Sequence, residues 1–290
     1  MAKYRLLRER VDRELTARGA ELQLPPAATD RQILQVHTRE YLDKIKYGGL
    51  SKLEQRRIGF PWSLKMVERS RRSTGATIAA AQTAIAEGIS INMAGGTHHA
   101  FADRGQGFCV FNDVCVAAKF IQQQFDVNRI MVVDCDVHQG NGTAAISRDD
   151  PTVFALSIQC ETNFPFQKTA GDLDVNLPAG TSDSHYLSAM RQAVEQSIET
   201  FQPEFVFYLA GADPFAGDRL GQLELTKLGL CQRDEWIFST FQQRNIPVAV
   251  SMAGGYANDI EDIVDIHFAT IDQALNRHGS TDQVANGVSG

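Results

Sequence analysis

The chain has 290 residues, of which 43% are hydrophobic and 22% are charged, so it can bury one large core, and one α/β domain is expected rather than two. Its formal net charge of −7 argues against a general binder of nucleic acid or of an anionic membrane, because either function would favour a basic face. No apolar run approaches membrane-spanning length, and the first residues lack the apolar core of a signal peptide, so neither a membrane span nor a secretory leader is expected.

The cysteines give no sign of a disulfide framework. They are odd in number and have no paired C-x-x-C spacing. This pattern predicts reduced, buried thiols and a cytoplasmic protein. The cysteines are Cys109, Cys115, Cys135, Cys160 and Cys231.

The first strong helix and strand signals lead into a pair of histidines. An Ala-rich helix is predicted over residues 63–87, and the apolar run of residues 89–94 is predicted as a strand that leads into Gly95-Gly96-Thr97-His98-His99. Paired glycines let the backbone turn sharply and approach a ligand closely. Taken alone, an ordinary turn and two adjacent surface histidines would explain this segment equally well.

The second strand carries the most informative motif of the chain. Residues 129–133 (RIMVV) have the composition of a buried parallel strand and run into Asp134-Cys135-Asp136-Val137-His138. Because strand side chains alternate between faces, Asp134, Asp136 and His138 point the same way. Two aspartates and a histidine suit catalytic Zn²⁺ or Fe²⁺, but this run supplies only two of the three expected protein ligands, so a distant residue must complete the set.

Two later strands end in further candidates. Residues 205–209 form an apolar strand that is followed by Gly211-Ala212-Asp213, and residues 246–253 form one that runs into Gly254-Gly255-Tyr256. Open α/β sheets build their sites outside the carboxyl ends of the strands. A lone aspartate after a strand is more often a helix cap, but the repetition of the pattern favours Asp213 as the missing ligand.

Together these strand ends supply what metal-assisted hydrolysis needs. A metal-bound water requires a base, a leaving group requires an acid, and a tetrahedral oxyanion requires a donor besides the metal. Histidine can serve as both acid and base, because its pKa lies near neutrality. The hydroxyl of Tyr256 can donate to the oxyanion.

The stretches between the strands are predicted as helices, which makes the sheet mainly parallel and its connections crossovers. The catalytic domain is expected to cover residues 1–278, and the polar, Gly- and Ser-containing residues 279–290 are expected to form a disordered tail. The remaining helices are predicted at residues 112–124, 184–201, 225–244 and 258–275.

The motifs resemble those of the histone deacetylase family, whose three-layer α/β/α fold with a mainly parallel central sheet is shared with arginases. The match spans about residues 58–266, which is most of the chain, and its motifs are highly specific. Within the family, residues 58–62, 103–109 and 217–221 are most similar to class IV, the histone deacetylase 11 type. The matching motifs are Gly95-Gly96-Thr97-His98-His99, Gly107-Phe108-Cys109, Asp134-Cys135-Asp136-Val137-His138-Gln139-Gly140-Asn141-Gly142, Gly211-Ala212-Asp213 and Gly254-Gly255-Tyr256.

The resemblance implies a role for each matching position. Asp136, His138 and Asp213 would hold Zn²⁺, or Fe²⁺ in its place. His99 would be the principal base and then the acid, whereas His98, oriented by Asp134, would act mainly as an imidazolium. Tyr256 would complete the oxyanion site. The residues expected to line the tunnel for the acyl-lysine side chain are Gly107, Phe108, Phe164 and Gly255.

A structural K⁺ ion is also implied by the resemblance. Family members bind a monovalent cation behind the zinc, much of it through backbone carbonyls. The matching positions here are Asp134, Asp136, His138, Ser157 and Ile158.

Two departures from related patterns sharpen this interpretation. Arginase-type enzymes hold two Mn²⁺ ions through Asp-x-His-x-Asp, but this chain has Gly140 where the second acid would lie, so one metal is expected. Asn141 stands where some family members have an aspartate that orients His99. An amide fixes the tautomer of the ring but does not stabilise its positive charge, so His99 is expected to be less basic than beside a carboxylate.

The predicted function is that of a zinc-dependent amidohydrolase that removes acetyl or longer fatty acyl groups from the ε-amine of lysine in a peptide or protein. Hydrolysis of acetylpolyamines is the alternative, since a net-negative enzyme would favour such cationic amines. An inactive module that binds acyl-lysine is a third possibility, which the acid and base residues argue against. The sequence does not indicate the oligomeric state or the preferred acyl length.

Overall fold

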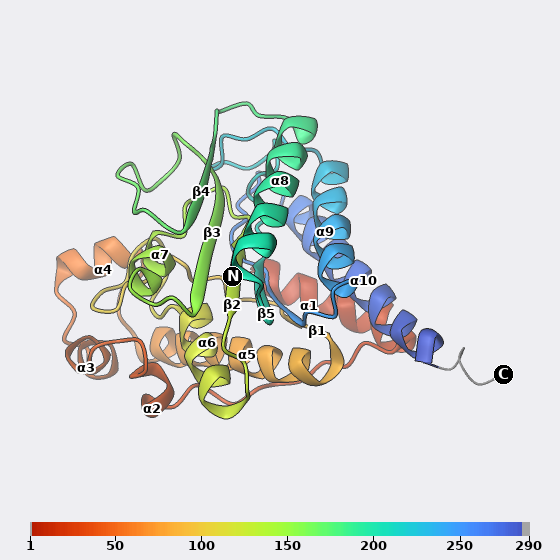
Figure 1. Cartoon of the computed structure of the whole chain (residues 1–290). Coiled ribbons are helices and arrows are strands. Elements are labelled where there is room, and N and C mark those ends of the chain that lie inside the picture. Colours follow the sequence, from red (N-terminus) through yellow and green to blue (C-terminus); the bar gives the residue numbers. More distant parts are fainter. Residues whose placement is uncertain (1, 286–290) are drawn as a thin grey trace.

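The computed structural model describes residues 2–285, with side chains described as far as Arg277. A six-stranded sheet forms its centre, in the order β1-β6-β5-β2-β3-β4, and every pairing is parallel (Figure 1). The strands are β1 (Ile89–Asn92), β2 (Ile130–Asp134), β3 (Val153–Cys160), β4 (Leu173–Leu177), β5 (Phe205–Leu209) and β6 (Val248–Ser251). The predicted α/β architecture with a parallel sheet is confirmed.

Helices cover both faces of the sheet and connect its strands (Figure 1). The long helices are α1 (Ala2–Leu15), α5 (Leu64–Glu87), α6 (Asp113–Gln124), α8 (Asp183–Phe201), α9 (Lys227–Gln242) and α10 (Ile260–Ala285). The shorter ones are the 3-10 helix η1 (Thr16–Arg18), α2 (Asp30–Ile33), α3 (Arg39–Tyr47), α4 (Lys52–Ile58) and α7 (Asn141–Ser147).

Alternation along each strand divides the interior into two cores, one on each face of the sheet. Met131 and Val133 of β2 pack in the core that α1, α8, α9 and α10 cover. Ile130 and Val132 of the same strand pack in the core beneath α5 and α6. This arrangement is the expected three-layer α/β/α fold, and it makes the central strands apolar on both faces.

Capping residues explain why several helices begin where the sequence indicates. The side chains of Ser63 and Asn112 accept hydrogen bonds from backbone N–H groups in the first turns of α5 and α6, and Gly88 ends α5. The predicted strands at residues 89–94 and 246–253 are shorter in the structure, because their last residues already belong to the site loops. We did not predict β4, a polar edge strand.

The expected domain boundary at residue 278 falls within α10, which runs to Ala285. Residues 286–290, the end of the predicted tail, lie outside the described residues, and the tail stays a prediction. None of the helices within residues 2–285 has both the length and the apolar composition needed to cross a bilayer.

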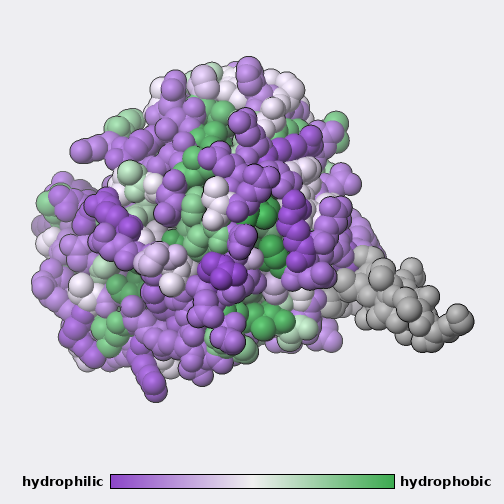
Figure 2. All heavy atoms as spheres, viewed as in Figure 1, coloured by the Kyte–Doolittle hydropathy of each residue, from purple (hydrophilic) through white to green (hydrophobic). Residues whose placement is uncertain are grey.

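The visible surface of the protein (Figure 2) is mostly polar, as expected when most of the large apolar side chains are buried in the two cores. The face seen in Figure 2 is mostly hydrophilic, with small groups of hydrophobic residues between the charged ones. Because all the strands are parallel, their carboxyl ends meet at one edge of the sheet, and the predicted site motifs follow four of them.

Candidate active site

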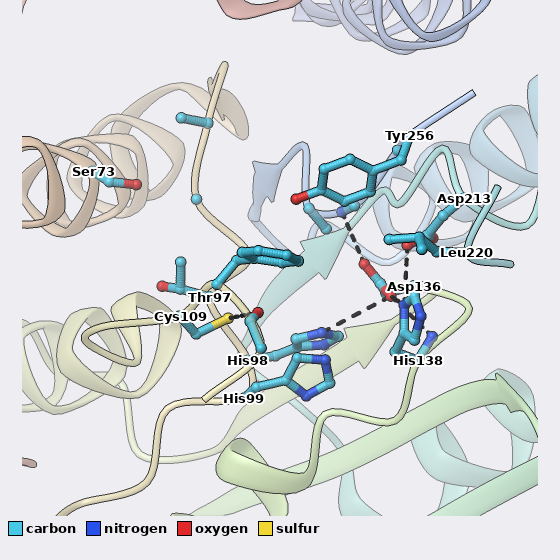
Figure 3. Close-up of a pocket in the computed structure, with 18 of the residues that line it drawn as sticks. Ser73, Thr97, His98, His99, Cys109, Asp136, His138, Asp213, Leu220 and Tyr256 are labelled. Carbon is cyan, nitrogen blue, oxygen red and sulfur yellow. Dashed lines mark hydrogen bonds and ion pairs between the residues drawn. The ribbon is translucent and has the colours of Figure 1, made fainter. Parts of the chain in front are cut away.

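A large cavity opens at the carboxyl edge of the sheet. Its volume is about 1270 Å³, and it is lined by the ends of the loops that follow β1, β2, β5 and β6 (Figure 3). The structure therefore brings together the residues that the sequence had scattered over more than 150 positions. Those that line the cavity are His98, His99, Gly107, Phe108, Asp136, His138, Phe164, Asp213, Gly255 and Tyr256.

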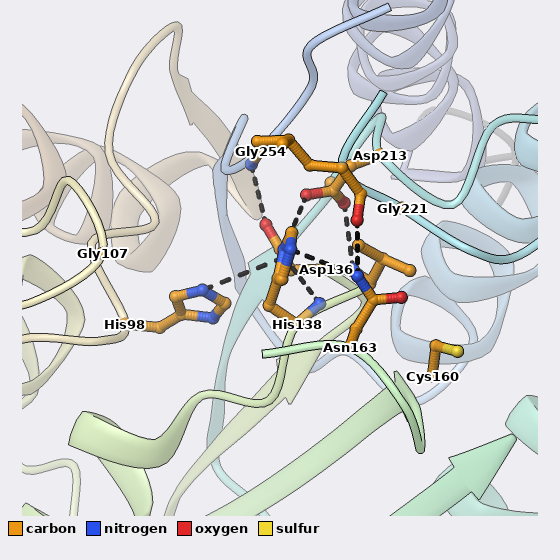
Figure 4. A network of polar contacts seen from close by, with 12 residues as sticks. His98, Gly107, Asp136, His138, Cys160, Asn163, Asp213, Gly221 and Gly254 are labelled. Carbon is orange, nitrogen blue, oxygen red and sulfur yellow. Dashed lines mark hydrogen bonds and ion pairs between the residues drawn. The ribbon is translucent and has the colours of Figure 1, made fainter. Parts of the chain in front are cut away.

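Asp136, His138 and Asp213 form a compact set of possible metal ligands. Each offers one ligand atom, and these atoms all lie within 4.8 Å of one another. Nδ1 of His138 lies 3.0 Å from Oδ1 of Asp136 and 3.3 Å from Oδ2 of Asp213 (Figure 4). The distant aspartate predicted to complete the set is thus beside the other two residues.

Backbone contacts fix both carboxylates from the protein side. The N–H of Gly254 donates to Oδ2 of Asp136 at 2.8 Å, and the N–H of Val137 donates to Oδ1 of Asp213 at 2.9 Å. A Cβ at position 254 would come within 1.9 Å of Oδ2 of Asp213, so only glycine fits there. The close approach suggested by the Gly-Gly pair is therefore present at Gly254.

A buried cation holds the two ligand loops from behind. Arg233 of α9 is fully buried, and its guanidinium donates to the carbonyl oxygens of Gly211 at 2.7 Å and Cys135 at 3.4 Å. Its Nε also donates to Asp234 at 2.9 Å, so the charge is paired. This contact was not predicted, because the sequence indicates α9 only as a helix that covers the sheet.

The electrostatics of the set suit a divalent cation. Burial and the charge of Asp136 raise the pKa of Asp213 to about 7, and Oδ2 of Asp213, although 3.3 Å from Nδ1 of His138, makes no hydrogen bond among the described residues. Burial lowers the pKa of His138, but the carboxylates of Asp136 and Asp213 outweigh it and raise that pKa to about 10. Negative charge is thus concentrated where a cation would be bound, and the donor types fit Zn²⁺ or Fe²⁺.

His98 is paired with a carboxylate. Its Nδ1 lies 2.6 Å from Oδ2 of Asp134, and both side chains are buried. Burial alone would lower the pKa of His98, but the charges of Asp134 and Asp136 raise it to about 9. The raised pKa favours the imidazolium form of His98 near neutral pH.

His99 lies against an amide instead. Its Nδ1 is 2.8 Å from Oδ1 of Asn141, the first residue of α7. Burial and the positive charge of His98 lower the pKa of His99 well below its ordinary value. The lowered pKa favours the neutral ring near pH 7, in which Nδ1–H can donate to the amide oxygen and Nε2 can accept a proton.

Asp113, which the sequence reasoning missed as a site residue, shapes the loop that carries the two histidines. Its carboxylate accepts hydrogen bonds from the N–H groups of Gly96 and Thr97 at 3.1 and 2.7 Å, and from the hydroxyls of Thr77 and Thr97. It is fully buried at the start of α6. Its position directly after the capping Asn112 is that of an ordinary residue in a first helical turn, so the sequence carried no signal for this role.

The hydroxyl-bearing ring of Tyr256 faces the cavity opposite the histidines (Figure 3). Burial and nearby negative groups raise the pKa of Tyr256, so its hydroxyl stays protonated and can donate. Its backbone N–H donates to Asp218, and its carbonyl accepts from Nε of Arg219 at 3.0 Å. Arg219 therefore helps to order the loop that carries Tyr256.

Aromatic side chains surround the approach to the metal ligands. Phe164 makes an edge contact with His99, with ring centroids 5.0 Å apart, and the Phe108 ring is 5.8 Å from that of Tyr256. A Cβ on Gly107 would come within 2.6 Å of the His99 ring, so this glycine lets the chain pack directly on the histidine. Phe108 is 43% exposed, as a residue at a cavity mouth would be.

Two residues of the expected K⁺ site line a small void in the sheet region. Asp134 and Ser157 are register partners on β2 and β3, and both line a small void of about 10 Å³, room for about one small ion or water. Oδ1 of Asp134 accepts from the N–H of Asp136 at 3.1 Å. Ile158 is the next residue of β3 but does not line the void.

Comparison with known protein families gives an independent result. The histone deacetylase domain family matches residues 1–271. An uncharacterized protein of the cyanobacterium Picosynechococcus is 46% identical over 243 residues, which cover 83% of this chain and 81% of the relative. Histone deacetylase 2 of Arabidopsis thaliana is 33% identical over 249 residues, 80% of this chain and 62% of that protein, so the chain spans less than two thirds of that relative.

The fold is also found among solved structures. The crystal structure of the HDA15 HD domain superposes with a TM-score of 0.80 at 23% identity, covering 94% of this chain and 83% of the other. At that identity the similarity shows the fold alone, and it agrees with the three-layer arrangement described above.

Proposed function

Because the chain belongs to the histone deacetylase family, we propose that it hydrolyses the amide between an acyl group and the ε-amine of lysine. The observation that carries this proposal is the convergence of three metal-ligand side chains, a charged and a neutral histidine, and a tyrosine on one cavity. A protein that only binds acyl-lysine would have no use for this pair of histidines.

The metal would be held by Asp136, His138 and Asp213, and Zn²⁺ or Fe²⁺ fits this donor set. When bound, such an ion supplies Lewis acidity to the scissile carbonyl and lowers the pKa of a water molecule. One metal is proposed rather than two, because Gly140 lies where a second acid would be needed.

The chain's own residues then divide the proton chemistry. His99, neutral and oriented by Asn141, takes the proton of the attacking water at Nε2 and passes it to the leaving amine. His98 keeps its proton and contributes positive charge, because Asp134 stabilises its imidazolium form. Tyr256 donates its hydroxyl to the oxygen on which negative charge develops.

The shape of the cavity favours acyl groups longer than acetyl. Ligand sites are typically about 300–1,000 Å³ in volume, and this cavity is about 1270 Å³. The same cavity is also lined by residues of α5 and of the segment before α2, among them Leu24, Pro25, Ser70, Ser73 and Ala76. We therefore propose a fatty acyl-lysine as the preferred substrate.

Hydrolysis of acetylpolyamines is the second candidate, and the net charge of −7 is the observation that favours it, since negative charge attracts cationic amines. We also propose a structural K⁺ ion at Asp134, Ser157 and the neighbouring backbone, where the small void lies. A cytoplasmic location stays the expectation drawn from the cysteine content.

The test is turnover of matched lysine peptides that carry acetyl, octanoyl and myristoyl groups. The protein is stripped of metal and reconstituted with Zn²⁺ or Fe²⁺, and His99→Ala serves as the inactive control. The highest kcat/KM on myristoyl or octanoyl peptide is expected. Preference for acetyl would overturn the fatty acyl proposal, and turnover of acetylpolyamines alone would overturn the lysine proposal.

A further inference from the structure

The first helix contributes one side chain to the cavity. Lys3 of α1 is buried, with 8% of its surface exposed, and it lines the cavity although 252 positions separate it from the residue it contacts. Its Nζ donates a hydrogen bond of 3.1 Å to the carbonyl oxygen of Gly255 and lies 5.1 Å from the centre of the Tyr256 ring. Helix α1 is held there by packing against α10 (Figure 1).

This contact fixes one peptide unit from both of its ends. The carbonyl of Gly255 and the N–H of Tyr256 belong to the same planar peptide. Lys3 holds the carbonyl, and the carboxylate of Asp218 accepts from the N–H. Gly255 has a φ of 143°, a backbone conformation that residues other than glycine rarely adopt. Because glycine is also free to adopt many other conformations, contacts from outside the loop are needed to hold this one.

The cost of burying the Lys3 ammonium argues that its position matters. Among the side chains that the structure describes, no carboxylate forms an ion pair with Lys3. Burying a charge without an opposite charge is unfavourable, and an apolar side chain would join α1 to the rest of the protein without that cost. The ammonium is instead satisfied by the Gly255 carbonyl and by the faces of Tyr4 and Tyr256, with Nζ 5.1 Å from the centre of each ring.

We infer that Lys3 is a positioning residue for Tyr256: it fixes the Gly255–Tyr256 peptide and the face of the tyrosine ring, so that the hydroxyl is held where the oxyanion develops. This inference rests on the proposed amide hydrolysis for its effect on rate, but the contact itself can be tested without turnover. Helix α1 is then part of the catalytic apparatus, and the cavity is completed by a segment far from all four motif loops.

The kinetic test compares Lys3→Met, Lys3→Arg and a matched control, Arg8→Met, which removes a cation from an exposed position of the same helix. The full chain is used, with any affinity tag at the C-terminal end. Lys3→Met is expected to lower kcat about 10-fold with KM changed less than about 2-fold, because the loss falls on the transition state. Lys3→Arg should recover most of the rate, and Arg8→Met should match the wild type.

A double-mutant cycle separates positioning from a general structural effect. If Lys3 acts through Tyr256, adding Lys3→Met to Tyr256→Phe lowers the remaining kcat less than about 2-fold. The inference is wrong if the fold-losses in kcat of the two single variants multiply in the double variant. It is also wrong if Lys3→Met alone has the same kcat as the wild type.

A ¹⁹F NMR experiment tests the contact between Lys3 and Tyr256 without relying on the proposed function. The tyrosines are replaced by 3-fluorotyrosine, and the ¹⁹F resonance of Tyr256 is identified by its loss in Tyr256→Phe. Lys3→Met should shift or broaden this resonance, whereas Arg8→Met should not. An unchanged Tyr256 resonance in folded Lys3→Met would overturn the inference, whether or not any acyl-lysine is hydrolysed.

Discussion

His98 and His99 are neighbours in one loop and both are buried, yet their pKa values are shifted in opposite directions. His98 lies beside the Asp134 carboxylate, which helps raise its pKa to about 9, and His99 lies beside the Asn141 amide and has a pKa well below its ordinary value. Burial disfavours the charged form of both rings. The carboxylates of Asp134 and Asp136 outweigh burial at His98, whereas the positive charge of His98 adds to it at His99. In the proposed mechanism, one loop thus supplies a positive charge and a proton acceptor at the same pH.

The largest expected effect comes from removing the neutral member of the pair. His99→Ala should lower kcat/KM by about 1,000-fold or more, because it deletes the group that moves the proton. His98→Ala should cost less, about 10- to 100-fold, since it removes only a nearby charge. Steady-state kinetics on an acyl-lysine peptide give both values, and an equal loss in the two variants would contradict the division of roles.

Replacing Asp134, the charged partner of His98, should reduce the difference in pKa between the two histidines by lowering the pKa of His98. Asp134→Asn removes a charge that stabilises the imidazolium, so the pKa of His98 should fall. His98 must keep its proton, and activity is therefore lost as the pH rises through its pKa, which is about 9 in the wild type. The alkaline limb of kcat/KM should move to lower pH and the maximum should fall about 10-fold. An alkaline limb that stays in place would show that another group sets it.

Placing a carboxylate beside His99 should also reduce the difference in pKa between the two histidines, in this case by raising the pKa of His99. Asn141→Asp places a negative charge 2.8 Å from Nδ1 of His99 and should raise the pKa of that ring. His99 must be neutral to accept a proton, so activity is lost as the pH falls through its pKa. The acidic limb of kcat/KM should then move to higher pH, and an unmoved limb would contradict our interpretation of Asn141.

The smallest effect is expected from packing alone. Gly107→Ala introduces a Cβ within 2.6 Å of the His99 ring and does so at a φ of 54°, where only glycine is unstrained. A displacement of the His99 ring should lower kcat about 5-fold without moving either limb of the pH profile of kcat/KM. Gly180→Ala is the matched control: it introduces the same Cβ at a φ of 77° in open space, so it should leave kcat at the wild-type value. A shift of the acidic limb in Gly107→Ala would mean that Gly107 acts on the charge of His99 as well as on its position.

The sequence was sufficient for four of the strands and for the candidate metal ligands because each signal is local. An apolar, β-branched run such as residues 130–133 predicts a buried strand, and the alternation of side chains predicts the shared direction of Asp134 and Asp136. Asp213 was predicted by the repetition of the same pattern after β5. The roles of the two histidines came from the family resemblance, and the separate partners of their rings are visible only in the folded chain.

The residues that were missed act over long distances in the sequence or have no distinctive local pattern. Edge strand β4 carries Asp174 and Asn176, so it has no apolar run. Asp113 reads as an ordinary residue of a helix start, and nothing near Lys3 or Arg233 indicates that either reaches the site. Such contacts depend on how helices pack across the sheet, which hydrophobic periodicity alone does not specify.

The measurement that tests the central claim most directly is hydrolysis of an octanoyl-lysine peptide as Zn²⁺ is added back to metal-free protein. Our account predicts that turnover rises to a plateau at one metal per chain and that Asp213→Asn, which removes one of three ligands, is nearly inactive at that point. If turnover does not depend on the metal, or if Asp213→Asn equals the wild type at one equivalent, the proposed site is wrong.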